Sequence, residues 1–283
     1  ITVKVKVSGE YTEAQPVLEY NFDEELTDGK AEDSIGDNDA VLHGEPAYVQ
    51  DDSYGQVLYL DGDDGDSMGG HDSYLEFPEG FFDGKDELTI SFDVNEVTRS
   101  GNYFVFTIGQ DLDKYLFLKI EPTTMRMSIT TNRYTGEQTA EYSSAYPNSS
   151  RTWMNLKLVI TEDSLSIYRN GELIAEEKVS ISISDLGEDL KAYIGKSFYD
   201  GSENLPADLY FRGFFDNVKV YDFAMGSDEI ARVYQQEEAD RLAMLEDVQR
   251  VADTFEIPNM DNVKGNITLP SEKDGVSISW KSS

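Results

Sequence analysis

Short apolar or alternating runs dominate the chain between Val17 and about Tyr221, and Gly, Asn and Asp punctuate them. Runs of this length with a period of two predict β-strands, and no helical period intervenes. Arg169, Asn170 and Gly171 have the composition of a tight hairpin turn. The predicted strands are VLEYNF (17–22), QVLYLDG (56–62), YLEFP (74–78), LTISFDVNEV (88–97), YFVFTIG (103–109), YLFLKIEP (115–122), MRMSITT (125–131), WMNLKLVIT (153–161), LSIYRNG (165–171), KAYIGKSFY (191–199) and FFDNVKVYD (214–222).

Many strands at regular spacing predict an antiparallel sandwich or barrel, so the fold class is all-β. The strand-rich region is about 200 residues long. That length fits a jelly roll of two curved antiparallel sheets better than a small immunoglobulin-type sandwich.

Both ends of the chain carry a different pattern. Residues 1–9, ITVKVKVSG, alternate apolar and basic side chains and predict one more strand, followed by a polar stretch. We interpret residues 1–15 as the terminal strand of a preceding domain and a linker. Because the chain opens on Ile1 with no signal peptide, we expect it to be a piece of a longer protein.

The period changes at residue 227, where apolar residues begin to recur every 3.6 positions up to about Glu256. Ser227 can cap the helix start, Asp228 and Glu229 favour its first turn, and Pro258 stops it. We therefore predict a helical linker over residues 227–257. The tail, 258–283, returns to strand patterns (VKGNITLP and VSISWKSS) but is too short to bury a core alone.

Composition narrows the possible functions. The formal net charge is −33, from 56 acidic against 23 basic residues. The negative electrostatic potential of such a charge repels phosphate backbones and anionic lipid. We therefore expect no nucleic-acid partner and no membrane insertion. The chain has no cysteine, which excludes disulfides, thiolate metal sites and cysteine nucleophiles. An acidic, tyrosine-rich chain without cysteine fits a secreted or bacterial cell-surface protein.

Three segments together resemble the laminin-G-like, concanavalin A-type jelly rolls of bacterial carbohydrate-active enzymes. They are RTWMNLKLVITEDSLSIYRNGELIAE (151–176), YIGKSF (193–198) and the closing motif FRGFFDNVKVYDFAMGSDEIARVY (211–234). The opening pieces LEYNFDE, DSIGDNDAVLHG and GQVLYLDG fit the same family. The resemblance places the jelly roll at residues 16–226. It also makes 258–283 similar to the start of a bacterial immunoglobulin-like domain, an arrangement familiar from multidomain arabinan- and xylan-degrading enzymes.

The resemblance implies a structural Ca²⁺ site. Asp216 lies within an apolar strand, where a bare charge needs a partner. In related jelly rolls the matching aspartate binds Ca²⁺, with help from the opening strand and an early glycine turn. Asp23 and Gly44 occupy the corresponding stretches. A hydrogen-bonded carboxylate without metal is the alternative interpretation of Asp216. A second acidic segment, residues 61–72, lacks the spacing of an EF-hand, and we expect a solvated loop there.

A sugar site needs exposed aromatic rings beside polar side chains. Residues 129–153 and 196–211 are rich in both, and in the resembling family these regions form the concave sheet and its rim loops. The predicted ligand-binding residues are Arg133, Tyr134, Tyr142, Tyr146, Lys196 and Tyr199. Packing in the core or across strands is the alternative for any one of these tyrosines.

No catalytic motif stands out in the sequence. Related catalytic jelly rolls use Glu-x-Asp-x-x-Glu on one strand, and this spacing is not found; Asp93 and Glu96 should face opposite sides of their strand. We therefore expect a non-catalytic module that binds a polysaccharide or oligosaccharide and works with other domains of the same chain. Two alternatives remain open: an adhesin-like structural spacer without sugar affinity, and a divergent catalytic jelly-roll glycosidase.

Overall fold

The computed structural model describes residues 14–62, 72–96, 103–121, 123–143, 152–199, 201, 208–257, 269–278 and 280. It divides into two compact units, Ile1–Val233 and Tyr234–Ser283, which are described separately below. The strand predicted over residues 1–9 lies outside the described residues.

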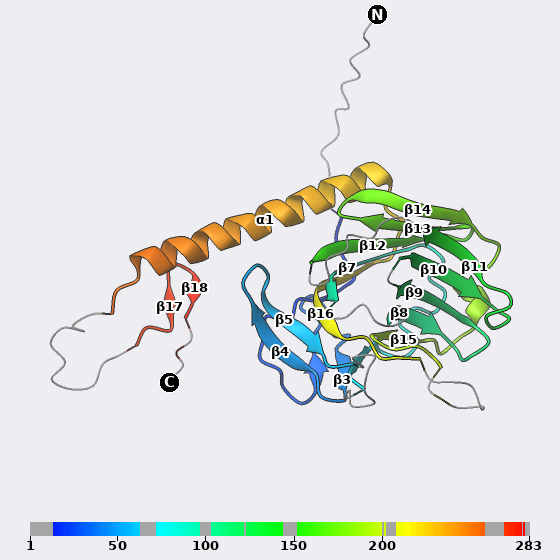
Figure 1. Ribbon diagram of the computed structural model, residues 1–283, viewed down its shortest axis with the longest axis horizontal. Coiled ribbons are helices and arrows are strands. Elements are labelled where there is room, and N and C mark those ends of the chain that lie inside the picture. The colour runs from blue at the N-terminus through cyan, green and yellow to red at the C-terminus, as the bar shows by residue number, and fades with distance from the viewer. Residues whose placement is uncertain are drawn as a thin grey trace, which may run out of the picture. The chain divides into compact units, whose positions relative to one another are not determined.

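The first unit is built from two antiparallel β-sheets (Figure 1). Sheet A contains, in spatial order, β14 (Glu172–Lys178), β13 (Ser164–Arg169), β12 (Met154–Ile160), β7 (Leu88–Glu96), β16 (Gly213–Tyr221), β5 (Gly55–Leu60) and β4 (Ala47–Asp51), and β1 (Leu18–Tyr20) also pairs with β16. Sheet B contains β11 (Gln138–Tyr142), β10 (Met125–Thr130), β9 (Tyr115–Ile120), β8 (Tyr103–Gly109), β15 (Lys191–Ile194), β6 (Tyr74–Glu76), β3 (Ala40–His43) and β2 (Lys30–Ala31). This architecture confirms the predicted all-β sandwich.

Strict alternation along the strands puts one apolar face of each sheet into a shared core. On β9, Leu116, Leu118 and Ile120 belong to that core, whereas Tyr115 and Phe117 belong to a separate aromatic cluster on the other face. Because successive side chains of a strand point to opposite faces, the same six residues build both the core and an outer surface.

All eleven predicted strands are present. The strand list from the sequence omits β2, β3, β4, β11 and β14 of the two sheets. These five are short or polar, and each lies at or next to the end of its sheet. Their stability comes from pairing with a neighbour rather than from apolar periodicity, so the sequence carries little local signal for them.

β16 changes its partner halfway along its length. Its first half, Gly213–Phe215, pairs with Leu58–Leu60 of β5, and its second half, Val218–Val220, pairs with Leu18–Tyr20 of β1. Between the halves the register with β7 shifts, and Asn217 adopts a left-handed backbone with φ of 50°. Asp216 therefore lies at an irregular point of the sheet.

Helix α1 (Ser227–Thr254) confirms the predicted helix and its start. In the first unit, Ser227 Oγ lies 2.9 Å from Tyr168 Oη, and Ile230 packs with Tyr221 and Met225 on sheet A. In the second unit, β17 (Glu272–Lys273) and β18 (Val276–Ser277) form a small hairpin, and Phe255 contacts Trp280. Among the described residues, no helix combines the length and apolarity that crossing a bilayer requires.

Candidate functional site

A pocket of about 180 Å³ opens on the outward face of sheet B. Strands β8, β9 and β10, the loop before β11 and the segment after β15 contribute its walls. The lining residues are Phe104, Thr107, Tyr115, Phe117, Lys119, Arg126, Tyr134, Glu137, Ser197, Phe198, Tyr199 and Asp208.

The floor of the pocket is aromatic. Phe104, Tyr115 and Phe117 are almost fully buried and form one cluster, against which Phe198 and Tyr199 pack. The rings of Phe104 and Phe117 lie 5.0 Å apart in an edge-to-face arrangement, which is favourable for aromatic pairs. The register across three strands puts Phe104 of β8, Lys119 of β9 and Arg126 of β10 side by side.

Polar side chains cross this floor in a connected chain. Arg126 NH1 donates to Glu137 Oε2 at 3.0 Å, and the Tyr115 hydroxyl donates to Glu137 Oε1 at 3.1 Å. The Tyr115 and Tyr199 hydroxyls lie 3.4 Å apart. Burial raises the pKa of the Tyr115 phenol far above its ordinary value, and the nearby Tyr199 and Glu137 add to the effect. The two phenols therefore stay protonated and can donate hydrogen bonds over the whole working range of pH.

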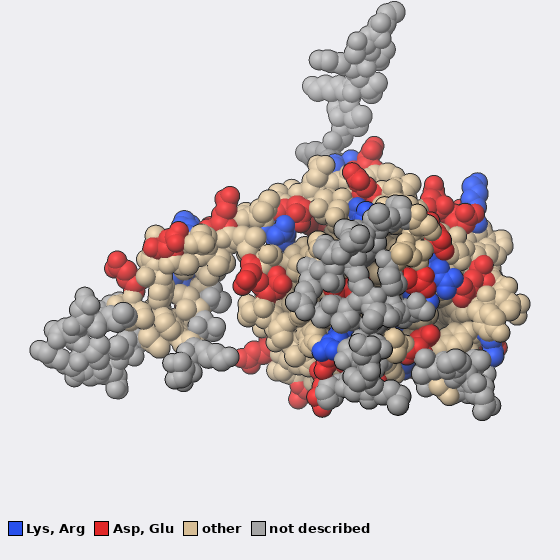
Figure 2. Space-filling model, viewed as in Figure 1, with Lys and Arg blue, Asp and Glu red and all other residues tan. Residues whose placement is uncertain are grey.

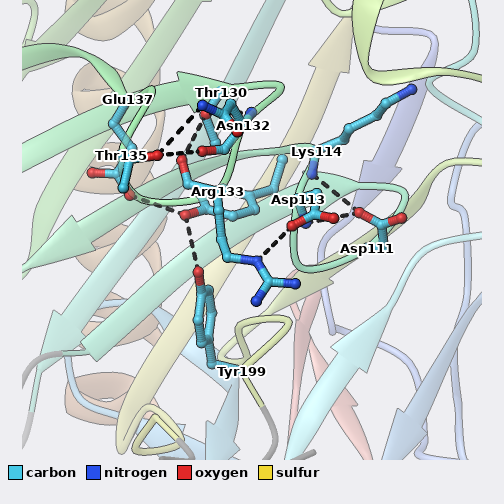
Figure 3. A network of polar contacts seen from close by, with 10 residues as sticks. Asp111, Asp113, Lys114, Thr130, Asn132, Arg133, Thr135, Glu137 and Tyr199 are labelled. Carbon is cyan, nitrogen blue, oxygen red and sulfur yellow. Dashed lines mark hydrogen bonds and ion pairs between the residues drawn. The ribbon is translucent and has the colours of Figure 1, made fainter. Parts of the chain in front are cut away.

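Tyr134 stands beside the pocket with 63% of its surface exposed. Its loop is held by local hydrogen bonds: Thr130 Oγ1 donates to the Arg133 carbonyl at 2.8 Å, and the Gly136 amide donates to the same oxygen at 3.2 Å. Arg133, with φ of 54°, reaches across to Asp113 (Figure 3). This anchoring presents the Tyr134 ring from a fixed loop.

The structure brings together some of the predicted ligand-binding residues. Tyr134 and Tyr199 line the pocket, and Arg133 lies near enough to Tyr199 for its charge to oppose the rise in that tyrosine's pKa, which burial causes. Lys196 instead places Nζ 4.5 Å from the Tyr74 ring centre and 4.9 Å from that of Tyr193.

The other two predicted tyrosines do not add to this pocket. Tyr142 packs against the main core beneath Arg169, whose guanidinium carbon lies 5.2 Å from the ring centre. Tyr146 lies outside the described residues.

The predicted ligand-binding residues do not include the strand residues of the pocket. Lys119, Arg126, Glu137 and the aromatic floor are additions that the structure makes. A signal existed in YLFLKI, where Tyr115, Phe117 and Lys119 occupy the positions that alternate with the core leucines and isoleucine. Aromatic and charged residues at every second position of a strand mark an outward face.

A second set of polar residues surrounds Asp216 on the opposite, outward face of sheet A. Asp216 is 4% exposed and its strand neighbour Asp93 is 7% exposed. The side-chain Nδ2 of Asn217 donates to Asp216 Oδ2 at 2.9 Å and to Asp93 Oδ2 at 3.0 Å, so it bridges the two carboxylates. Asp216 Oδ1 is buried and has no hydrogen-bond partner. Burial, and then the Asp93 charge, raise the pKa of Asp216 to about 9.

The predicted metal ligands are partly brought together. Asp23 follows the end of β1, and its charge contributes to the raised pKa of Asp216. Burial, followed by the charges of Glu24 and Glu19, also raises the pKa of Asp23. Gly44 follows β3 with φ of 77°, and the amide of the next residue, Glu45, donates to Ser73 Oγ at 3.0 Å.

An orphaned buried carboxylate oxygen between acids is the kind of donor that Ca²⁺ accepts. The described residues contain no cluster of three or more His, Cys, Asp or Glu side chains around one point. Ca²⁺ also takes carbonyl and water oxygens, so two acidic ligands fit it. The buried Asp216 and the adjacent Asp23 are therefore compatible with a calcium ion.

Comparison with known proteins places the chain among carbohydrate-related folds. The family model Laminin_G_3, described as "Concanavalin A-like lectin/glucanases superfamily", matches residues 69–231. An alpha-L-arabinofuranosidase of Bifidobacterium longum subsp. longum is 30% identical in a 172-residue alignment that covers 55% of this chain. The chain spans only 15% of the length of that relative.

Solved structures share the fold at low identity. Domain 4 of AbnA, a GH43 extracellular arabinanase from Geobacillus stearothermophilus in complex with arabinotriose, is 16% identical with a TM-score of 0.59. The match covers 79% of this chain and all of that domain. The binding domain of botulinum neurotoxin DC, in complex with rat synaptotagmin II, is 12% identical with a TM-score of 0.58, over 78% of this chain and 51% of that one.

Proposed function

Because the chain belongs to the concanavalin A-like lectin/glucanases superfamily, we propose that it is a non-catalytic carbohydrate-binding module of a secreted multidomain glycoside hydrolase. The observation that carries the proposal is the pocket on sheet B, where exposed and half-buried aromatic rings stand beside Arg, Lys, Glu and Asp side chains. Sugar rings stack on aromatic faces through their C–H groups, and sugar hydroxyls exchange hydrogen bonds with polar side chains.

The function is one of targeting. A module that holds a polysaccharide raises the local concentration of a linked catalytic domain near its substrate, without any chemistry of its own. A shallow site with few stacks and hydrogen bonds gives affinities on the order of 10 μM to 1 mM. When several such modules bind one polysaccharide at once, the weak single-site binding adds up and keeps the enzyme on its substrate.

The relatives support a plant-type polysaccharide as the ligand. One is named an alpha-L-arabinofuranosidase, and another is a domain of an extracellular arabinanase solved with arabinotriose. Arabinan or arabinoxylan is therefore the first ligand to test. The extracellular relative also supports a secreted or cell-surface location.

Calcium has a structural role in this proposal. The Asp216 carboxylate, with help from Asp23, would hold the ion where β16 changes its partner strand. The ion would supply positive charge to a buried acidic point of sheet A, while the sugar pocket lies on sheet B.

Two arrangements of carboxylates bear on catalysis by the described residues. Glu137 and Asp208 line the pocket, but Glu137 accepts hydrogen bonds from Arg126 and Tyr115, and Asp208 accepts one from Ser197, so neither is free to act as an acid or a nucleophile. Asp93 and Asp216 are close enough to share Asn217, but both are more than nine-tenths buried and neither lines the pocket. Glycoside hydrolysis needs two carboxyl groups that flank an accessible glycosidic bond. The alternative of a structural spacer without sugar affinity does not account for the open aromatic pocket.

A glycan array on the full chain tests the proposal. We expect signals from arabinan or arabinoxylan oligosaccharides that Tyr134→Ala removes. An array without any signal, repeated with calcium present, would overturn the proposal.

A further inference from the structure

The two cations of the sheet B pocket are already paired. Lys119 Nζ lies 2.8 Å from Glu121 Oε1, and its side chain is only 9% exposed. Arg126 NH1 lies 3.0 Å from Glu137 Oε2, and its guanidinium lies 5.1 Å from the Phe117 ring centre. Lys119 Nζ also lies 5.3 Å from the Phe104 ring centre, so each positive group lies between an acid and an aromatic ring.

Glu137 is itself fully engaged. One of its oxygens accepts from Arg126 and the other accepts from Tyr115, and its side chain is 12% exposed. An anionic ligand group at Arg126 would lie beside this carboxylate, which would repel it or have to be displaced. Breaking a largely buried ion pair leaves an uncompensated charge, which is strongly unfavourable.

Further acids surround the same cations. Asp208 lines the pocket and accepts from Ser197 Oγ at 2.8 Å. The register of β10 and β11 also places Glu141 directly opposite Arg126. The described lining carries two cations and two acids, Lys119 and Arg126 against Glu137 and Asp208. Near the lining lie two more acids, Glu121 and Glu141, and one more cation, Arg133, which is itself paired with Asp113.

The field of the whole chain acts in the same direction. The net charge is −33, and acidic side chains outnumber basic ones over the face seen in Figure 2. A negative surface potential repels an approaching anion before any contact forms. Aromatic faces and hydroxyl groups, which remain for a ligand, suit uncharged sugars.

We propose that the pocket selects uncharged glycans and rejects those with carboxylate, sulfate or phosphate groups, because Glu137 occupies the arginine that would otherwise receive an anion. This inference rests on the proposed sugar-binding function and concerns the ligand class of the same pocket. The ligand is thus a chain of neutral pentoses or hexoses. Uronic-acid and sialic-acid glycans should bind more weakly or not at all.

Titration calorimetry on the full chain tests the inference with three probes: arabinotetraose, xylotetraose and tetragalacturonate. We expect at least one neutral probe to bind and the uronate to bind about tenfold more weakly or not at all. Measurement at about 20 mM and about 200 mM salt should narrow the difference at the higher ionic strength, because salt screens the repulsion.

Glu137→Gln is the decisive variant. It keeps the shape of the side chain and an oxygen for Tyr115, but it releases the charge of Arg126. We expect it to gain affinity for tetragalacturonate relative to the neutral probes. Glu176→Gln, an exposed charge change on β14 of sheet A, is the matched control and should leave the preference unchanged. If a thermal melt shows that Glu137→Gln is not folded at the assay temperature, Asp208→Asn removes the other acid of the pocket instead.

The outcomes separate the two proposals. Uronate binding as tight as neutral binding in the unmodified chain would overturn the inference and leave the sugar-binding function standing. A folded Glu137→Gln variant with no gain towards uronate would overturn the role of the Arg126–Glu137 pair. Failure of every probe and of the glycan array would count against the proposed function itself.

Discussion

Arg133 and Asp113 contact each other twice: the Arg133 amide donates to the Asp113 carbonyl at 2.9 Å, and the Arg133 Nε donates to the Asp113 carboxylate. The two contacts tie the loop that carries Tyr134 to the turn between β8 and β9. Arg133 was predicted as a ligand-binding residue, and its geometry shows how it can support the pocket without touching a sugar.

The first prediction follows from this anchor. Asp113→Ala removes the side-chain contact and keeps the backbone one, so it should loosen the loop and lower glycan affinity about threefold to tenfold, because the loop must then be ordered on binding. The melting temperature should change little, since the ion pair is half exposed. Calorimetry and a thermal melt measure both effects; an unchanged affinity would mean that the loop is held by its other hydrogen bonds.

Tyr134 provides the second prediction. Tyr134→Ala should cost about 1 kcal/mol or more of binding free energy, roughly a fivefold or larger loss of affinity, because exposed aromatic side chains are typical hot spots. Tyr134→Phe should keep most of the affinity if the ring stacks on the sugar. Leu173→Ala, which removes an exposed apolar side chain from β14, is the control. Equal losses in the Ala and Phe variants would assign the role to the hydroxyl instead.

The third prediction concerns pH and calcium at Asp216. With chelator present, the folded protein binds a proton at Asp216 up to a pKa of about 9, whereas an unfolded aspartate loses its proton near 4. Stability from this group is therefore complete below about pH 4 and declines as pH rises towards 9. Ca²⁺ should offset this loss, because it favours the ionised carboxylate.

Thermal melts at several pH values, with calcium and with chelator, measure this effect. Asp216→Asn should flatten the pH dependence seen in chelator and abolish the response to calcium. A melting temperature that chelator leaves unchanged in the unmodified chain at pH 8 would count against the metal site.

Gly62 gives a prediction about the sandwich itself. A Cβ at this position would lie 2.2 Å from the Phe211 carbonyl oxygen, closer than any real side chain comes to backbone. Gly62→Ala should therefore lower the free energy of unfolding by about 1–3 kcal/mol or more. Gly226→Ala is the matched control, because a Cβ there meets nothing within 4 Å. Denaturant titration compares the free energies of unfolding of the two variants. Equal values would mean that the backbone at Gly62 can move away from Phe211 without loss of stability.

The fifth prediction is an absence of hydrolysis. Prolonged incubation of the purified chain with arabinan and arabinoxylan oligosaccharides should release no new reducing ends. The two carboxylates that line the pocket, Glu137 and Asp208, are already held by hydrogen bonds from neighbouring side chains. Release that Asp208→Asn or Glu137→Gln abolishes would instead identify a divergent glycosidase.

Local patterns predicted the strands and the helix because burial imposes a period on the sequence. Leu116, Leu118 and Ile120 could be assigned to the core from their spacing alone. The pairing of β16 with both β5 and β1 could not be predicted in this way, because it depends on contacts between residues more than 150 positions apart in the sequence.

The pocket was harder to predict than the fold. Tyr134 and Tyr199 were selected because aromatic residues in polar loops are conspicuous. Lys119, Arg126 and Glu137 come from three different segments, and only the strand order β11-β10-β9 brings them to one place. Lys196 looked equally available in the sequence, but the fold places two tyrosine rings beneath its ammonium group.

The interleaved strand order decides where this protein can be cut. The family match begins at residue 69, yet β1, β3, β4 and β5 all lie before it and complete both sheets. A recombinant fragment that started at residue 69 would leave β16 bare along one side and β6 without its neighbour β3. Unpaired strand edges of this kind form hydrogen bonds with other chains. We therefore expect such a truncated protein to aggregate during expression. A protein that retains the segment from residue 14 onward should purify as a folded domain.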